Sequence, residues 1–230
     1  MIAGAASGIG AALAERLAAA GARLLLSDIS STALQQVADR LGATPFMADV
    51  SHPDDVERLA DAAGGTRLVC LNAGVTSTAT GPVWEAPPEE WWRVIDINLG
   101  GVVNGLRSFV PRLLAAGEQA HVLITASLAG LATWPGGGPY AASKHAVVTV
   151  AEQAALALAD SPIHITVLCP ALVRSGMSEV GDDPLHVADE ALAALKDRRF
   201  IAAPAQWHQA IRERAERLAL GLAPAVREPN

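Results

Sequence analysis

Short apolar runs alternate with longer amphipathic segments along most of the 230 residues. The apolar runs have the length and the Val, Leu and Ile content of buried strands, and the amphipathic segments have the periodicity of helices. A chain that repeats strand and helix in this way folds as a parallel sheet with helices on both faces. The predicted fold class is therefore α/β, with a single doubly wound, Rossmann-like parallel sheet of about seven strands.

No repeat or low-complexity linker divides this succession of elements. The strand candidates lie at 1–3, 23–28, 43–50, 67–74, 121–127, 164–170 and 199–204. The helix candidates lie at 9–20, 31–41, 53–63, 89–116, 140–159, 187–196 and 207–220. We expect one domain over residues 1–230, with a C-terminal helix at about 207–220. Gly, Asp and Pro interrupt the periodicity at about 175–186, which predicts a short substrate lid there.

Composition and charge exclude several classes of function. The net charge is -7 and no basic run is present, which argues against a nucleic-acid-binding surface. No run of about twenty apolar residues occurs, so we expect no membrane span. Cys70 and Cys169 form no CxxC or Cys/His spacing, and the histidines are not clustered with carboxylates. These patterns predict no metal site and a reducing, cytoplasmic location.

A glycine-rich segment joins the first strand candidate to the first helix candidate. It reads "AGAASGIG" at 3–10 and carries Gly4, Gly8 and Gly10. Glycines at such a turn let backbone N–H groups and the helix N-terminus approach a pyrophosphate. Asp28, at the end of the second strand candidate, is placed to accept hydrogen bonds from the adenosine ribose. Asp28 also suits a turn or a helix cap before Ser31, so this alternative stays open.

Tyr140 is the only tyrosine, and Lys144, one of two lysines, follows it by four residues. Residues four apart on a helix share one face, so both side chains are expected in one site. An ammonium beside a phenol favours the phenolate and lowers the phenol pKa from its ordinary value of about 10. The pair therefore predicts that Tyr140 acts as a general acid/base. The alternatives are a core tyrosine with a satisfied hydroxyl and a solvated helix lysine.

With these motifs the sequence resembles the short-chain dehydrogenase/reductase family, single-domain NAD(P)-dependent oxidoreductases of the Tyr-x-x-x-Lys type, over residues 1 to about 204. The resemblance implies a catalytic tetrad of Asn98, Ser127, Tyr140 and Lys144. It further implies that Lys144 binds the nicotinamide ribose and that Ser127 donates a hydrogen bond to the substrate oxygen. Asn98 would hold a water that links Lys144 to solvent. Alone, Ser127 fits a strand-ending turn and Asn98 a helix-boundary cap.

The resemblance, together with Asp28, gives an expected set of cofactor-binding residues. They are Gly4, Ser7, Gly8, Ile9, Gly10, Asp28, Asp49, Val50, Asn72, Ala73, Gly74, Tyr140, Lys144, Pro170, Val173 and Ser175. The chain departs from the usual family pattern at Ala3, Leu71, Ala171 and Ser175. None of these departures removes a reacting group, although Ala171 restricts the backbone where the family usually has glycine.

We expect NAD(H) in preference to NADP(H). An NADP site needs a cation for the 2′-phosphate, but the glycine-rich loop offers Ala5 and Ala6 and the second strand is followed by Ile29 and Ser30. Asp28 would repel the phosphate. A non-catalytic dinucleotide sensor on the same fold is the alternative function. A nucleotide-sugar epimerase is disfavoured, because it needs a C-terminal sugar-binding domain.

The expected substrate is an apolar secondary alcohol or ketone. Leu128, Trp134, Leu172 and Met177 lie in the segments that would wall the pocket. The helix candidate from Tyr140 is apolar on nearly every face, which predicts a homodimer or homotetramer through 99–116 and 140–159. Three tryptophans, Trp84, Trp91 and Trp92, are expected to pack against the rest of the protein.

Overall fold

A seven-stranded parallel sheet with the order β3-β2-β1-β4-β5-β6-β7 forms the centre of the molecule. The structure is a computed structural model that describes residues 1–79, 82–176 and 178–226. Its strands are β1 (Ile2–Ala3), β2 (Leu25–Asp28), β3 (Thr44–Met47), β4 (Leu68–Leu71), β5 (Ala120–Thr125), β6 (Ile163–Leu168) and β7 (Ile201–Ala202). The predicted fold class is confirmed.

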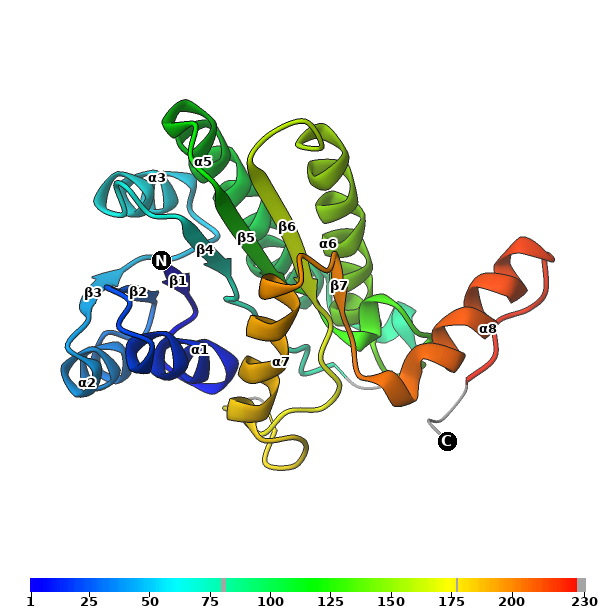
Figure 1. The fold of residues 1–230 in the computed structure, drawn as a ribbon. Coiled ribbons are helices and arrows are strands. Elements are labelled where there is room, and N and C mark those ends of the chain that lie inside the picture. The colour runs from blue at the N-terminus through cyan, green and yellow to red at the C-terminus, as the bar shows by residue number, and fades with distance from the viewer. Residues whose placement is uncertain (80–81, 177, 227–230) are drawn as a thin grey trace.

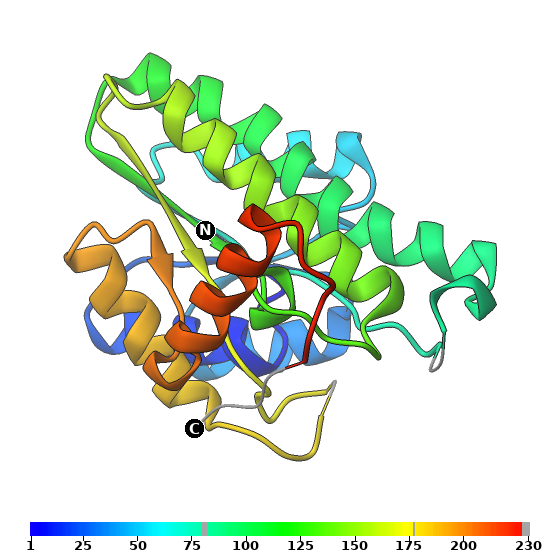
Figure 2. The ribbon, with the colours of Figure 1, turned by 90° about the vertical axis from the view of Figure 1, so that its right-hand side faces the viewer.

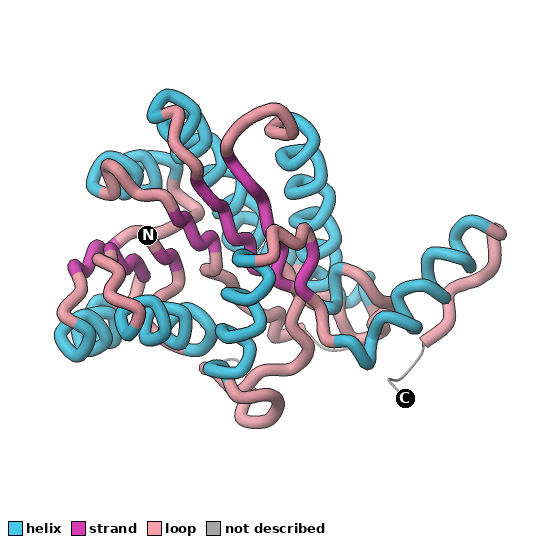
Figure 3. Tube along the Cα trace, in the orientation of Figure 1, coloured by secondary structure: helices cyan, strands magenta, loops and turns pink. Residues whose placement is uncertain are grey.

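Helices cover both faces of this sheet (Figures 1 and 3). One face carries α1 (Gly8–Ala19), α2 (Ser31–Leu41) and α7 (Pro184–Lys196). The other carries α3 (Pro53–Ala62), α5 (Gly101–Ala116) and α6 (Gly138–Ala157), and α4 (Pro88–Ile95) packs against α6. Along β5, Val122 and Ile124 pack into the second layer while Leu123 packs into the first. Both faces of the strand are thus buried, which explains its continuous apolar sequence.

The segment predicted as one helix over 89–116 consists of three parts. Between α4 and α5 the backbone forms a π-helical turn, Asp96–Gly100. A π turn adds one residue to a helical turn and re-aims the side chains that follow. It places Asn98 fully inside the protein, with 0% of its surface exposed. The prediction of a helix over this range is confirmed, but the π turn inside it was not predicted, because contacts with distant segments rather than local spacing hold it.

Most other predicted boundaries differ from the observed ones by a few residues. Gly117 ends α5 in the left-handed conformation at φ +66°, and Pro53 begins α3, as their positions in the sequence indicated. Helix α7 begins at Pro184 rather than 187, because the Asp183 carboxylate accepts the N–H of Leu185 and caps it.

The last helix, α8 (His208–Ala219), projects from the side of the molecule beyond β7 (Figure 1). The segment that follows turns back toward the body (Figure 2). The Arg217 guanidinium holds this turn by donating to the Ala223 carbonyl at 2.9 Å. Among the described helices, none has the length and hydropathy needed to cross a membrane.

Two of the three tryptophans expected to pack lie at the surface. Trp84, in the 3₁₀ turn Val83–Glu85, is 81% exposed, and Trp92 on α4 is 64% exposed. The packing prediction was wrong for both side chains. Neighbouring residues on a helix point in different directions, so Trp91 is half-buried on α4 while Trp92 faces outward, and Trp84 precedes the helix.

Candidate active site

A cavity of about 740 Å³ opens at the carboxyl ends of the strands. In open α/β sheets this end is where ligands bind. It is lined by sixteen of the predicted site residues: Gly4, Ser7, Gly8, Ile9, Asp28, Asp49, Val50, Asn72, Ala73, Gly74, Ser127, Tyr140, Lys144, Pro170, Val173 and Ser175. The lining does not include Gly10 and Asn98, which lie behind the walls.

The glycine-rich turn forms one end of the cavity. Gly4 and Gly8 have φ values of +71° and +54°, which side chains other than glycine rarely adopt. A Cβ at Gly10 would stand 2.0 Å from the Gly4 carbonyl oxygen, so glycine there lets α1 pack against the turn. The N-terminus of α1 begins at Gly8, beside the cavity, where it can meet an anion. These residues fit the pyrophosphate of a dinucleotide.

Asp28 links the glycine-rich turn to the start of α2. One carboxylate oxygen accepts the N–H of Ala6 and the other the N–H of Ser30, both at 3.0 Å. Asp28 therefore supports the turn before α2, the alternative considered from sequence, and also lines the cavity. Each oxygen keeps a second lone pair for a ribose hydroxyl. Among the described residues that line the cavity, Lys144 is the only Lys or Arg.

The turn after β3 is held by neighbouring helices. The Asp49 carboxylate accepts the N–H and hydroxyl of Ser51 at 2.9 and 2.7 Å, and its backbone N–H donates to Asp55 of α3. The Val50 carbonyl accepts the Asn104 side-chain amide of α5 at 2.9 Å. These contacts fix the part of the cavity wall formed by Asp49 and Val50.

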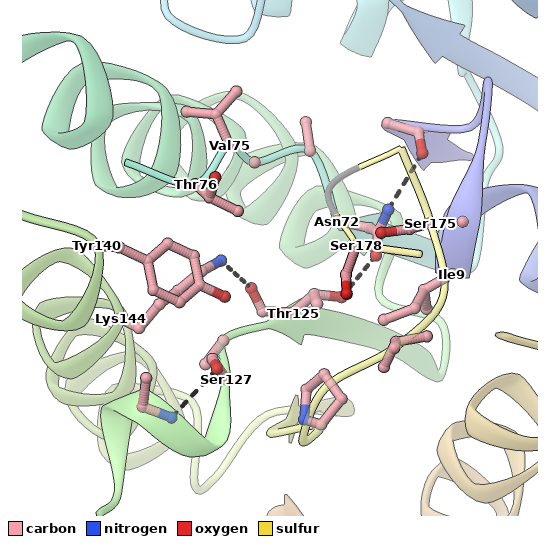
Figure 4. Close-up of a pocket in the computed structure, with 18 of the residues that line it drawn as sticks. Ile9, Asn72, Val75, Thr76, Thr125, Ser127, Tyr140, Lys144, Ser175 and Ser178 are labelled. Carbon is pink, nitrogen blue, oxygen red and sulfur yellow. Dashed lines mark hydrogen bonds between the residues drawn. The ribbon is translucent and has the colours of Figure 1, made fainter. Parts of the chain in front are cut away.

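Asn72 joins three neighbouring parts of the sheet edge. Its amide donates to the Gly4 carbonyl at 3.1 Å, and its side-chain oxygen accepts the Thr125 hydroxyl at 2.9 Å (Figure 4). The side chain thus ties the glycine-rich turn to the end of β5. Asn72 thereby fixes the part of the cavity wall that it lines.

Tyr140 and Lys144 extend together from α6 into the cavity, with Val75 and Thr76 across from them (Figure 4). The Lys144 ammonium donates to the Thr125 carbonyl at 3.0 Å and lies 5.7 Å from the centre of the Tyr140 ring. The helix spacing thus brings both side chains into one site.

Ser127 follows β5 and caps the short 3₁₀ turn Leu128–Gly130. Its hydroxyl oxygen accepts the Ala129 N–H at 3.1 Å, in line with the turn role considered from sequence. The O–H remains as a donor, and the side chain lines the same cavity as Tyr140.

The pKa of Tyr140 is shifted upward, whereas we expected a downward shift. Burial raises it above its ordinary value, and the Ser127 hydroxyl opposes this only in part. Burial also lowers the pKa of Lys144 to about 8. The expectation that Lys144 lowers the phenol pKa was wrong for this structure, because removing a phenolate from water costs more free energy here than its neighbours restore.

Asn98 makes three hydrogen bonds inside the protein. Its side-chain oxygen accepts the Val75 N–H at 2.8 Å, and its amide donates to the Val75 carbonyl and the Ser143 hydroxyl, both at 3.0 Å. The water-holding role implied by the resemblance stays a prediction. Ser143 and Thr125 were missed by sequence reasoning, although a buried serine in an apolar helix beside Tyr140 was a usable signal.

The other end of the cavity is apolar. Leu128, Trp134 and Leu172 line it, as the sequence suggested, whereas Met177 lies outside the described residues. Trp207, directly before α8, and Val226, after it, line this end too. Within the described ranges, no three His, Cys, Asp or Glu side chains gather to hold a metal ion.

Comparisons with known proteins agree with this geometry. The family model described as "short chain dehydrogenase" matches residues 1–184. A 1-deoxy-11-beta-hydroxypentalenate dehydrogenase of Streptomyces avermitilis is 40% identical over 187 residues, which are 77% of this chain and 69% of the relative. A 3beta-hydroxysteroid dehydrogenase of Eggerthella lenta is 36% identical over 179 residues, covering 74% and 68%. The crystal structure of a Burkholderia phymatum short chain dehydrogenase/reductase with NAD is 32% identical, with a TM-score of 0.91, and the match covers 100% and 96% of the two chains.

Proposed function

The chain belongs to the short-chain dehydrogenase/reductase family, and from this premise we propose that it is an NAD(H)-dependent oxidoreductase of apolar secondary alcohols and ketones with Tyr140 as its acid/base. The protein is an enzyme that acts on CH–OH groups and binds a nicotinamide dinucleotide. The convergence of Ser127, Tyr140 and Lys144 on one cavity is the observation that carries the finer assignment.

Each of the three residues has a distinct part in alcohol oxidation. When bound, the nicotinamide supplies the hydride acceptor. Tyr140, as phenolate, accepts the hydroxyl proton of the substrate, and Ser127 donates a hydrogen bond to the same oxygen. Lys144, with a pKa of about 8, is largely protonated at neutral pH and, in the role that the resemblance implies, binds the nicotinamide ribose. In ketone reduction the same groups act in reverse, and Tyr140 donates the proton.

The preference for NAD(H) is supported by charge. A 2′-phosphate placed near Asp28 would meet a carboxylate, and the described lining residues near Asp28 include no Lys or Arg to offset it. The ribose hydroxyls of NAD, in contrast, are donors that a carboxylate accepts. Asp28 is therefore the residue that selects between the two dinucleotides.

The apolar end of the cavity supports a bulky, apolar substrate. The named relatives act on a hydroxylated pentalenate and a hydroxysteroid, both alcohols on fused carbon rings. Trp134, Trp207 and Leu172 offer flat and aliphatic surface for such a ring system. We propose cyclic secondary alcohols as the substrate class, with the segment 175–186 as a lid over them.

A homodimer or homotetramer is proposed from the outer face of α6. Leu156 is 78% exposed there, which is unusual for a leucine unless a second subunit covers it. A reducing cytoplasm stays our expectation for the location, since Cys70 and Cys169 are both buried and unpaired.

The test is a panel of alcohols and ketones, from short linear ones to hydroxysteroids and bicyclic terpenoid alcohols, with NAD(H) or NADP(H) followed by nicotinamide absorbance. We expect turnover to rise with ring number and with NAD(H). Tight NADH binding without turnover of any member would instead favour the non-catalytic sensor.

A further inference from the structure

We propose that Ser143 is a positioning residue that fixes the catalytic turn of α6 through Asn98. This inference rests on the proposed function, in which Tyr140 is the acid/base. The observation that supports it is a series of hydrogen bonds that joins the two facing walls of the cavity, with Ser143 in the middle of the series.

The turn that carries Tyr140 is weakly held by its own helix. Helix α6 has no side-chain cap at its start, and three glycines, Gly136, Gly137 and Gly138, precede or begin it. Gly138 has a φ of +43°, in the left-handed region. First turns of helices have unpaired backbone groups and unravel most easily. Tyr140 therefore needs support from outside the helix backbone to stay in one place.

Ser143 supplies that support at the next turn. Its hydroxyl donates to the Tyr140 carbonyl at 2.7 Å and accepts the Asn98 amide at 3.0 Å. Both Ser143 and Asn98 have 0% of their surface exposed. A hydrogen bond in such a place cannot be replaced by one to bulk water, so losing it leaves the Asn98 N–H unpaired.

Asn98 extends the connection to the opposite wall. Its amide group pairs with both the N–H and the carbonyl of Val75, which lines the cavity across from Tyr140 (Figure 4). Ser143 thereby holds the spacing between the wall at Val75 and the phenol. Acid/base catalysis depends steeply on such a spacing, since a displacement of about 1 Å can cost about a hundredfold in rate.

The experiment compares Ser143→Ala with Ser161→Ala, a matched control. Ser161 makes the same kind of bond from its hydroxyl to the carbonyl three residues earlier, that of Leu158 at 2.8 Å, but it lies after the end of α6 and outside the cavity lining. With the best alcohol of the panel, we expect Ser143→Ala to lower kcat about tenfold or more while KM and the NADH Kd change less than about twofold. The primary isotope effect with the carbinol-deuterated alcohol should rise, because chemistry becomes slower, whereas loss of folded enzyme would leave it unchanged. The control should match wild type.

If Ser143→Ala does not fold, Ser143→Cys keeps the volume with a weaker donor and should shift kcat in the same direction. A kcat within about threefold of wild type in the folded variants, or a loss confined to the NADH Kd, would overturn the proposal. Amide hydrogen exchange tests the connection without turnover. The Val75 N–H, remote in sequence, should exchange faster in the Ser143 variant, and unchanged exchange there would also overturn the proposal. A wild type that turns over nothing contradicts the proposed function alone.

Discussion

The Trp134 indole meets the Tyr140 ring edge to face, with ring centroids 6.2 Å apart and planes inclined by 86°. Trp134 is also 54% exposed and lines the cavity, so one side of the indole supports the phenol and the rest faces the space for substrate. Such a ring adds to substrate affinity through apolar contact.

We expect Trp134→Ala to raise KM for a cyclic alcohol about tenfold and to leave KM for a short linear alcohol nearly unchanged. Steady-state kinetics with both alcohols measure this. Trp92→Ala, which removes an exposed indole outside the cavity lining, serves as the control and should change neither value. Equal effects on both alcohols would mean that Trp134 acts only on Tyr140.

Tyr140→Phe should lower kcat about a hundredfold or more, since it deletes the hydroxyl that exchanges the proton. The phenyl ring keeps the contact with Trp134, so the site should remain in shape. NADH binding, followed by fluorescence titration, is the internal check and should be unaffected. Turnover near the wild-type level would remove Tyr140 from the acid/base role.

Cofactor choice should depend on Asp28. We expect wild-type kcat/KM to favour NAD over NADP by about ten- to a hundredfold, because carboxylate and phosphate repel each other. Asp28→Asn with Ile29→Arg should shift the ratio toward NADP. Asn keeps an acceptor for Ala6 or Ser30, whose N–H groups Asp28 holds, so it disturbs the turn less than Ala would. Ile29→Arg alone is the control, and an unchanged ratio in the double variant would contradict the assignment.

Lys144 should destabilise the fold at neutral pH. Its folded pKa of about 8 lies below the ordinary 10.5, so the unfolded chain binds more protons between these values. This group's contribution to stability is therefore lost as pH falls from 10.5 toward 8. The difference between these two pKa values corresponds to about 3 kcal/mol of unfolding free energy.

Lys144→Met should raise the free energy of unfolding at pH 7 and flatten its rise between pH 8 and 10.5, measured by urea denaturation. A variant less stable than wild type at pH 7 would show that the bond to Thr125 outweighs burial of the charge.

The outer face of α6 should be a subunit contact. Leu156→Arg places a charge on it and should yield smaller particles by light scattering at micromolar concentration, since a buried unpaired charge is costly. Leu218→Arg, on exposed α8, is the control and should leave the mass unchanged. A monomeric wild type would exclude the proposed assembly.

Sequence alone could predict those parts of the site that depend on local spacing. The glycine-rich turn can be predicted from a strand–turn–helix pattern with glycines at Gly4, Gly8 and Gly10. The catalytic pair can be predicted because Tyr140 and Lys144 share one helix face. Both were located by counting residues. The assignment to an enzyme family was confirmed for the same reason, because these spacings occur in a fixed order.

Other features depend on contacts between distant segments. The π turn at Asn98 is held by bonds to Val75 and Ser143, and no local pattern encodes those partners. The phenol pKa likewise depends on how deeply several loops bury Tyr140, which spacing does not measure. Val226 reaches the cavity only because the chain turns back after α8.

The two ends of the cavity are built by different stretches of the chain and by different kinds of atoms. The end at Gly4 and Gly8 is shaped by backbone, whereas the end at Trp134, Leu172 and Trp207 is shaped by side chains from later loops. Backbone geometry tolerates little change, but exposed side chains can be exchanged freely. Random variation confined to the side chains of Trp134, Leu172 and Trp207, sparing the neighbouring cofactor-binding candidates Pro170, Val173 and Ser175, would therefore explore new selectivities without retuning nucleotide affinity, which makes the scaffold readily evolvable.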